Sequence, residues 1–178
     1  MNERPNTNAA TPAPGKRRDV RRLAMQVLYQ LDVSNDQTPD RQAILDGLDP
    51  DFDKPTIREQ GVDLALSAWA SRAEADQAIQ NLTPDWPTHR QPPVDRAILR
   101  LAYHEMSAGV TPIKVAINEA VELAKQYASE HSPAFINGVL DKLAKTIDPK
   151  HVVTTETQDP QPIDEQAWLE DAKQQPSS

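Results

Sequence analysis

Residues 111–147 read TPIKVAINEAVELAKQYASEHSPAFINGVLDKLAKTI, a stretch that predicts two consecutive helices. Each expected helix opens with a residue suited to the cap, Thr111 or Ser132, followed by a proline suited to the first helical position. Apolar residues then recur at the spacing of one buried helical face. The clearest set is Ile136, Val139, Leu140, Leu143 and Ile147. We expect one helix from Pro112 to about Glu130 and another from Pro133 to about Ile147.

The same periodicity extends the helical prediction toward the N-terminus. Pro93 is placed to open a helix and Gly109 to close it. The aromatic share is only 4%, and a core of Ala, Leu, Val and Ile favours helices over strands. We therefore expect an all-α domain of six or seven helices. The remaining expected helices cover Asp19–Val33, Arg41–Leu48, Thr56–Leu82 with a break near Ser71, and Pro93–Gly109.

Composition predicts one domain between two irregular ends. The chain has 178 residues, enough for one domain with extended ends. Residues 1–15 carry three prolines and little apolar material, which predicts disorder. The domain is expected at 16–148, followed by an acidic, Pro- and Gln-rich tail at 149–178. Within that tail, Ile163–Lys173 could form a short helix.

Several classes of protein do not fit the composition. The chain contains no cysteine, which excludes disulfides, thiolate metal sites and cysteine nucleophiles. No apolar run approaches the roughly 20 residues that span a bilayer, and the N-terminus does not look like a signal peptide. We expect a soluble, cytoplasmic protein.

The net charge of −8 conceals a local basic cluster. Residues 16–22 read KRRDVRR, with five cations and one anion, whereas acids dominate from residue 146 onward. The apolar stripe of the first helix centres near Val20, Val27 and Leu31. On a helical wheel, the roughly opposite face holds Arg18, Arg22, Met25 and Tyr29, with Arg21 at its edge.

Two interpretations of this helix remain open. Arginines bind phosphates and an exposed Tyr29 would stack on an unpaired base, which indicates RNA binding. Alternatively, the arginines form a solvated face and Tyr29 packs against another helix. Phe135, in the first turn of the last helix, presents the same choice. It could lie beside a phosphate held by free N–H groups, or at the margin of the core, which the pattern alone favours.

Motifs of known enzymes are missing from the sequence. It has no Gly-rich phosphate loop, paired-His zinc motif or nucleophile elbow. His104 and Glu105 are neighbours, so their side chains point about 100° apart on a helix, and we expect surface or boundary positions for both. Asp95, Glu105, Glu119 and Glu122 offer carboxylates, but no spacing selects a pair. We expect no enzymatic activity, cofactor or metal.

Three segments together resemble the transcription antitermination factor NusB family. They are RRLAMQVLYQLD (21–32), VDRAILRLAYHEM (94–106) and VAINEAVELAKQYASEHSPAFINGVLDKLAK (115–145), and the likeness extends over about Lys16–Lys145. The resemblance implies an all-helical fold of two small perpendicular bundles. It also implies binding of a boxA RNA element together with NusE, a small-subunit ribosomal protein. The complex would support read-through by RNA polymerase, notably in ribosomal RNA operons.

The resemblance also implies roles for particular residues. Those carried to RNA binding are Arg17, Arg18, Arg21, Tyr29, Phe135 and Lys142, and those carried to the NusE interface are Tyr29, Asp95 and Ile113. His131 and Ala134 stand where relatives often carry Asp and a basic residue. One lost anion and one lost cation roughly offset each other, so the surface can be retained.

Two alternative functions are compatible with this fold. NusB-like domains also open certain ribosomal RNA cytosine methyltransferases, but those chains continue into a large catalytic domain with cysteines. The other alternative is a helical protein-interaction module or homodimer without RNA binding. It would keep apolar interface positions but show no salt-dependent affinity for RNA.

Overall fold

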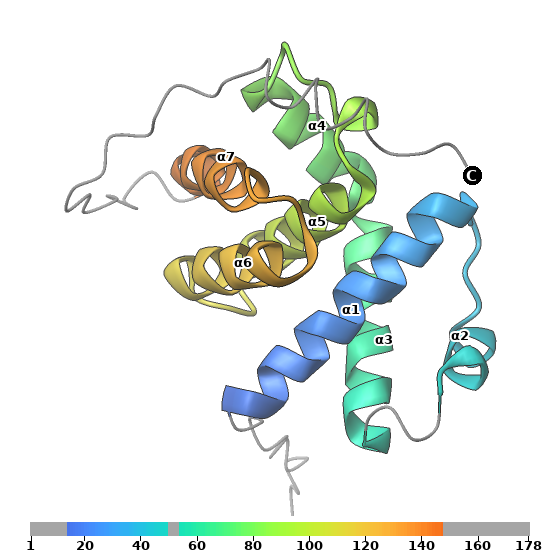
Figure 1. Ribbon diagram of the computed structural model, residues 1–178. Coiled ribbons are helices and arrows are strands. Elements are labelled where there is room, and N and C mark those ends of the chain that lie inside the picture. Colours follow the sequence, from blue (N-terminus) through green and yellow to red (C-terminus); the bar gives the residue numbers. More distant parts are fainter. Residues whose placement is uncertain (1–13, 50–53, 148–178) are drawn as a thin grey trace, which may run out of the picture.

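The computed structural model describes residues 14–49 and 54–147 of the chain (Figure 1). These residues form seven α-helices and one 3-10 helix, and no strand occurs among them. The all-helical prediction is confirmed for this part of the chain, where η1 is the one element that the sequence did not indicate. The elements are α1 (Pro14–Ser34), α2 (Arg41–Gly47), α3 (Pro55–Ala70), α4 (Arg72–Leu82), η1 (Thr88–Arg90), α5 (Pro93–Ser107), α6 (Ile113–Tyr127) and α7 (Ser132–Ile147).

Local signals fix most helix ends. Pro55 and Pro93 lie in the first turns of α3 and α5, where a missing N–H costs nothing. The Asp40 carboxylate caps α2 by accepting the backbone N–H of Ala43 at 2.7 Å. Ser71 separates α3 from α4, so the predicted break is confirmed. Gly109 follows α5 with φ 66°, a left-handed conformation that suits glycine after a helix.

Several boundaries differ from the prediction: α6 ends at Tyr127 rather than near Glu130, and α7 includes Ser132, which was expected to cap it. Helix α1 begins at Pro14 rather than Asp19, so residues 14 and 15 are helical although disorder was expected through residue 15. Helix α6 begins at Ile113 because Thr111 does not cap it: its hydroxyl donates to Glu105 Oε1 at 2.6 Å. The disorder expected for residues 1–13 and the short helix expected in the tail lie outside the described residues.

The helices form two small groups that share α5 (Figure 1). In one group α1 crosses α3, and α2 lies beside α3. In the other, α4, α6 and α7 surround α5, which also packs against α1 and α3. This arrangement agrees with the two-bundle fold that the resemblance implied. No described helix is both long and apolar enough to cross a membrane.

Helices α1 and α3 approach closely at a glycine. A Cβ atom placed on Gly61 would lie 2.8 Å from Leu23 Cδ2 and 3.0 Å from Leu23 Cβ. Leu23 is itself buried in the core, so it has little room to move aside. The absence of a side chain at position 61 therefore sets the distance between the two helices.

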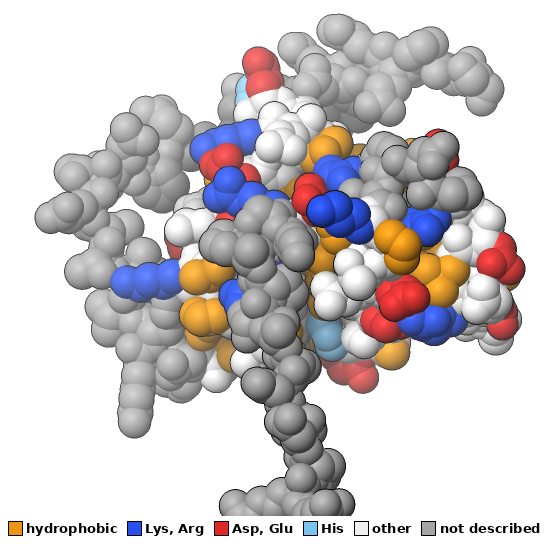
Figure 2. Space-filling model, turned by 90° about the horizontal axis from the view of Figure 1, so that it is seen from below, with side chains coloured by type: hydrophobic (Ala, Val, Ile, Leu, Met, Phe, Trp, Pro, Cys, Tyr) orange, Lys and Arg blue, Asp and Glu red, His pale blue; other side chains and the backbone are white. Residues whose placement is uncertain are grey.

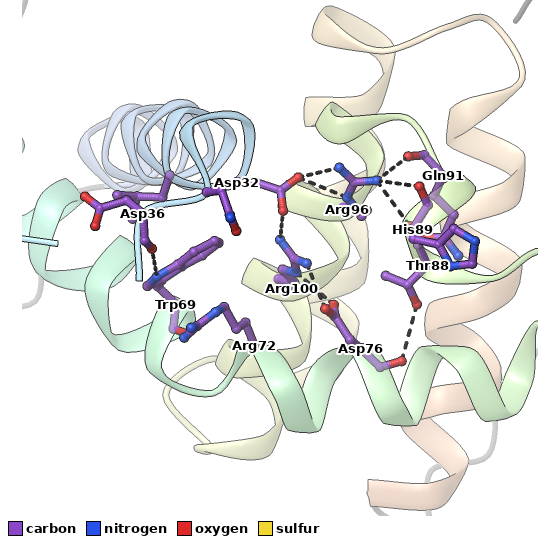
Figure 3. Close-up of polar contacts among 12 residues, drawn as sticks. Asp32, Asp36, Trp69, Arg72, Asp76, Thr88, His89, Gln91, Arg96 and Arg100 are labelled. Carbon is purple, nitrogen blue, oxygen red and sulfur yellow. Dashed lines mark hydrogen bonds and ion pairs between the residues drawn. The ribbon is translucent and has the colours of Figure 1, made fainter. Parts of the chain in front are cut away.

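A buried ion-pair network joins the two groups near α5 (Figure 3). Asp32 accepts from Arg100 Nη1 at 2.7 Å and from Arg96 Nη2 at 2.6 Å, and Arg100 also donates to both carboxylate oxygens of Asp76. Burial alone would raise the pKa of Asp32, but the hydrogen bonds from Arg100 and Arg96 outweigh it and lower the pKa. Arg96 also donates to the backbone carbonyls of Thr88, His89 and Gln91.

Candidate nucleic-acid interface

The basic cluster lies on the first turns of α1 and is partly exposed. Arg17 is exposed, and 67% of the Arg18 side chain is accessible. Arg22 is half-buried, with its Nη2 atom 3.7 Å from the Asp19 carboxylate one turn away. An accessible guanidinium can bind a phosphate through two parallel N–H groups, and Arg17 and Arg18 have the exposure that such binding requires.

Arg21 does not lie on that surface, contrary to its expected place at the edge of the exposed face. Its residue is 7% exposed, and its Nε atom donates to both oxygens of Glu105 at 2.9 and 3.0 Å. Its Nη2 atom donates to the Thr111 hydroxyl at 3.2 Å. Glu105 is also buried, which corrects its expected surface or boundary position. Arg21 therefore joins α1 to α5 and the turn after it.

The helical wheel predicted an exposed position for Met25, and this prediction was wrong because Met25 is buried. Helix α1 packs against both α3 and α5, so its buried face is wider than one stripe. Tyr29 does lie on the outside, with 38% of the residue exposed. Its ring is thus available for contact with a base or a partner.

An open groove of about 450 Å³ separates the start of α1 from α6. Arginines from α1 line one side, and α6 supplies carboxylates, an amide and an aromatic ring on the other. The sequence placed Arg22 on the exposed face of α1 without assigning it to RNA binding, and it did not indicate the exposed Tyr127 at the end of α6. Arg22 lies off the apolar stripe of α1, whereas Tyr127 lies on the same helical face as the buried Ala120 and Leu123, so the pattern gave no sign of its exposure. The lining residues are Arg18, Asp19, Arg21, Arg22, Glu119, Glu122, Leu123, Gln126 and Tyr127.

The residues expected on α7 have different exposures. Lys142 is exposed, so its ammonium group can reach a phosphate. Phe135 is buried, with 5% of the residue exposed, as the core interpretation of its position favoured. Most of its ring contributes to packing, which leaves little area for stacking on a base. His131 is half-buried, and Ala134, next to Phe135, is exposed.

Asp95 is fully buried in the isolated chain, which corrects the expectation that it faces a partner. It lies in the first turn of α5, where its Oδ2 atom accepts from the Ser132 hydroxyl at the start of α7, at 3.0 Å. Burial raises its pKa to about 6, against the lowering effect of the Ser132 hydrogen bond. Ile113, the other expected partner residue, is half-buried at the first position of α6.

The described residues do not assemble a recognisable catalytic or metal centre. His104 lies 3.4 Å from the Ser71 hydroxyl, whereas the neighbouring Glu105 faces Arg21, so these two side chains do not share one site. In the described part of the chain, no three His, Cys, Asp or Glu side chains could hold a metal ion together. On the face shown in Figure 2, Lys and Arg side chains are interspersed with Asp and Glu.

Known proteins resemble this chain in both sequence and fold. The NusB family matches residues 18–145. A protein named transcription antitermination protein NusB, from Roseiflexus castenholzii, is 41% identical over 130 residues, covering 70% of this chain and 88% of its own length. The structure of T. maritima NusB has a TM-score of 0.63 and 34% identity, covering 76% of this chain and 92% of that one.

A further solved structure is titled as the antitermination factors NusB and NusE in complex with dsRNA. One of its chains has a TM-score of 0.63 and 24% identity, covering 75% of this chain and 99% of its own, and at this identity the likeness concerns the fold. The family match spans most of the described residues, and the Roseiflexus relative aligns over nearly its whole length. This chain therefore belongs to the NusB family.

Proposed function

We propose that this protein is a transcription antitermination factor that binds boxA-type single-stranded RNA together with NusE. The resulting complex supports read-through by RNA polymerase, notably in ribosomal RNA operons. The name of the Roseiflexus relative supports the process. One observation supports the RNA surface: accessible arginines at the start of α1 border a groove that ends at the exposed Tyr127.

We assign the RNA contacts by accessibility. Arg17, Arg18 and Lys142 would neutralise phosphates, and Tyr29 would stack where the RNA and NusE surfaces meet. Ile113 would contact NusE. Arg21, Phe135 and Asp95 would support this surface from within, since each is buried.

In this proposal the protein acts by binding rather than catalysis. It works in the cytoplasm, where bacterial RNA polymerase transcribes. The free energy of RNA binding would come largely from released counterions, so affinity should fall steeply with salt.

The test is an RNA titration of the full chain with and without NusE, using boxA-like and scrambled strands at several salt concentrations. Replacing Arg17 and Arg18 by Ala should weaken binding and reduce the salt dependence, because two phosphate contacts are lost. A matched control replaces Arg41 and Arg58, on α2 and α3, and removes the same charge elsewhere.

The control variant should retain nearly wild-type affinity. Equal losses in the two variants would mean that net charge alone sets the affinity, and the α1 surface would lose its assignment. NusE binding without RNA affinity would leave a protein-interaction module. A folded wild-type chain that binds neither would end the proposal.

A further inference from the structure

We infer that Glu119 is a positioning residue that holds Arg18 toward the RNA, and that buried Arg21 anchors Glu119 from behind. The inference rests on the proposed function, because it assigns the means by which that RNA surface is ordered. It gives Arg21 a role in RNA binding without contact with RNA.

The outer part of this arrangement is the pair formed by Arg18 and Glu119. Arg18 Nε donates to Glu119 Oε1 at 3.2 Å, and the two side chains are 67% and 16% exposed. Within the described residues, the terminal nitrogens of Arg18 make no other hydrogen bond or ion pair, although the Arg18 charge also acts on the Glu122 carboxylate. The Glu119 carboxylate thus uses one edge of the guanidinium and leaves the accessible end for a phosphate, which prefers two parallel N–H donors.

The inner part of this arrangement is Arg21, which holds the Glu119 carboxylate in place. Arg21 Nη1 lies 3.9 Å from Glu119 Oε2, while the rest of the Arg21 guanidinium is held by Glu105 and Thr111. Charged groups therefore alternate from the buried Glu105 through Arg21 and Glu119 to the exposed Arg18. A side chain held in its bound orientation loses less conformational entropy on binding, so this chain of contacts should increase the affinity for RNA.

The ordinary alternative is that Glu119 is an acid beside a cation and only repels RNA. The two roles predict opposite results. If only charge matters, removing a carboxylate from the groove should tighten RNA binding. If Glu119 positions Arg18, removing it should weaken binding even though the net charge becomes less negative.

Glu74 provides the control for charge. It is exposed in the first turn of α4, outside the groove, and its removal changes the net charge by the same amount. We expect Glu74→Ala to leave RNA affinity nearly unchanged.

The experiment measures RNA affinity of the full chain, with NusE present, across a series of salt concentrations. Glu119→Ala should weaken binding roughly three- to tenfold and reduce the slope of log K against log salt by about 0.7, the value for one phosphate contact on a single strand. Glu119→Asp keeps the charge but shortens the reach, so it should also weaken binding. Glu119→Gln keeps an acceptor at the same reach and should retain the wild-type slope.

Circular dichroism establishes which variants fold. If Glu119→Ala does not fold, the RNA affinity of Glu119→Asp tests the inference instead. Tighter binding by Glu119→Ala with an unchanged slope, or wild-type binding by Glu119→Asp, would overturn the inference. A wild-type chain that binds no RNA with NusE present would instead refute the proposed function, and this inference with it.

Discussion

Asp95→Asn should change how the stability of the protein depends on pH. The Asp95 carboxyl is fully buried, its Oδ1 atom has no hydrogen-bond partner among the described residues, and its pKa is raised from 3.8 to about 6. Folding therefore favours the protonated carboxyl. The resulting stabilisation is fully present below about pH 4 and is lost as the pH rises through about 6.

The size of this effect follows from the shift. Two pKa units at 1.36 kcal/mol each amount to about 3 kcal/mol at full protonation, of which roughly 2 kcal/mol appears between pH 7 and pH 4. Asparagine cannot titrate, so the free energy of unfolding of the wild type should gain this amount relative to Asp95→Asn as the pH falls. The absolute stability of the variant at pH 7 is less diagnostic, because its amide N–H groups also need partners, at a cost of about 1–3 kcal/mol.

Urea unfolding followed by circular dichroism between pH 4 and pH 8 measures the difference. Taking the difference cancels the titration of other groups, including Asp32, whose lowered pKa makes the fold less stable as the pH falls. Asp63→Asn is a suitable control, since that side chain is 56% exposed. Parallel stability curves for the wild type and Asp95→Asn would refute the argument.

Three further substitutions test the fold by the same urea measurement. Gly61→Ala should destabilise the fold by about 1–2 kcal/mol, because the clash with Leu23 exceeds the gain in helix propensity. Leu23→Ala in the same chain should relieve only the part of the clash made by Cγ and Cδ2, since the Leu23 Cβ atom stays 3.0 Å away. Arg100→Ala should cost about 1–3 kcal/mol, because Asp76 loses its arginine partner and Asp32 loses one of its two, whereas Arg41→Ala, which removes an exposed pair, should cost little. Equal costs would contradict the difference in burial. Arg21→Ala should also cost several kcal/mol, and wild-type stability would show that its buried contacts contribute nothing.

Helix positions could be predicted because their signals are local. Prolines such as Pro93 and apolar residues three and four apart identify a helix whatever it packs against. The break at Ser71 was visible for the same reason, as a blurred apolar pattern. The start of α1 was missed because Pro14 and Gly15 precede the apolar stripe.

The burial of polar side chains could not be predicted in this way. Arg21 is buried because Glu105, 84 residues further along the chain, meets it from another helix. Asp95 is buried because the start of α7 covers it through Ser132. Both residues look like surface charges in their own segments, and only the packing of distant helices distinguishes them from Arg18, which remains exposed.

The ion pairs around α5 also determine whether the domain can be divided. Asp32 belongs to the first group of helices, and both of its arginines come from α5, the core of the second. A chain cut in the loop before Pro93 would separate this acid from Arg96 and Arg100. Each fragment would then carry charges whose counter-ions lie on the other, alongside newly exposed apolar surface. The two groups should therefore unfold together as one cooperative unit, and separately expressed halves should fold only when mixed.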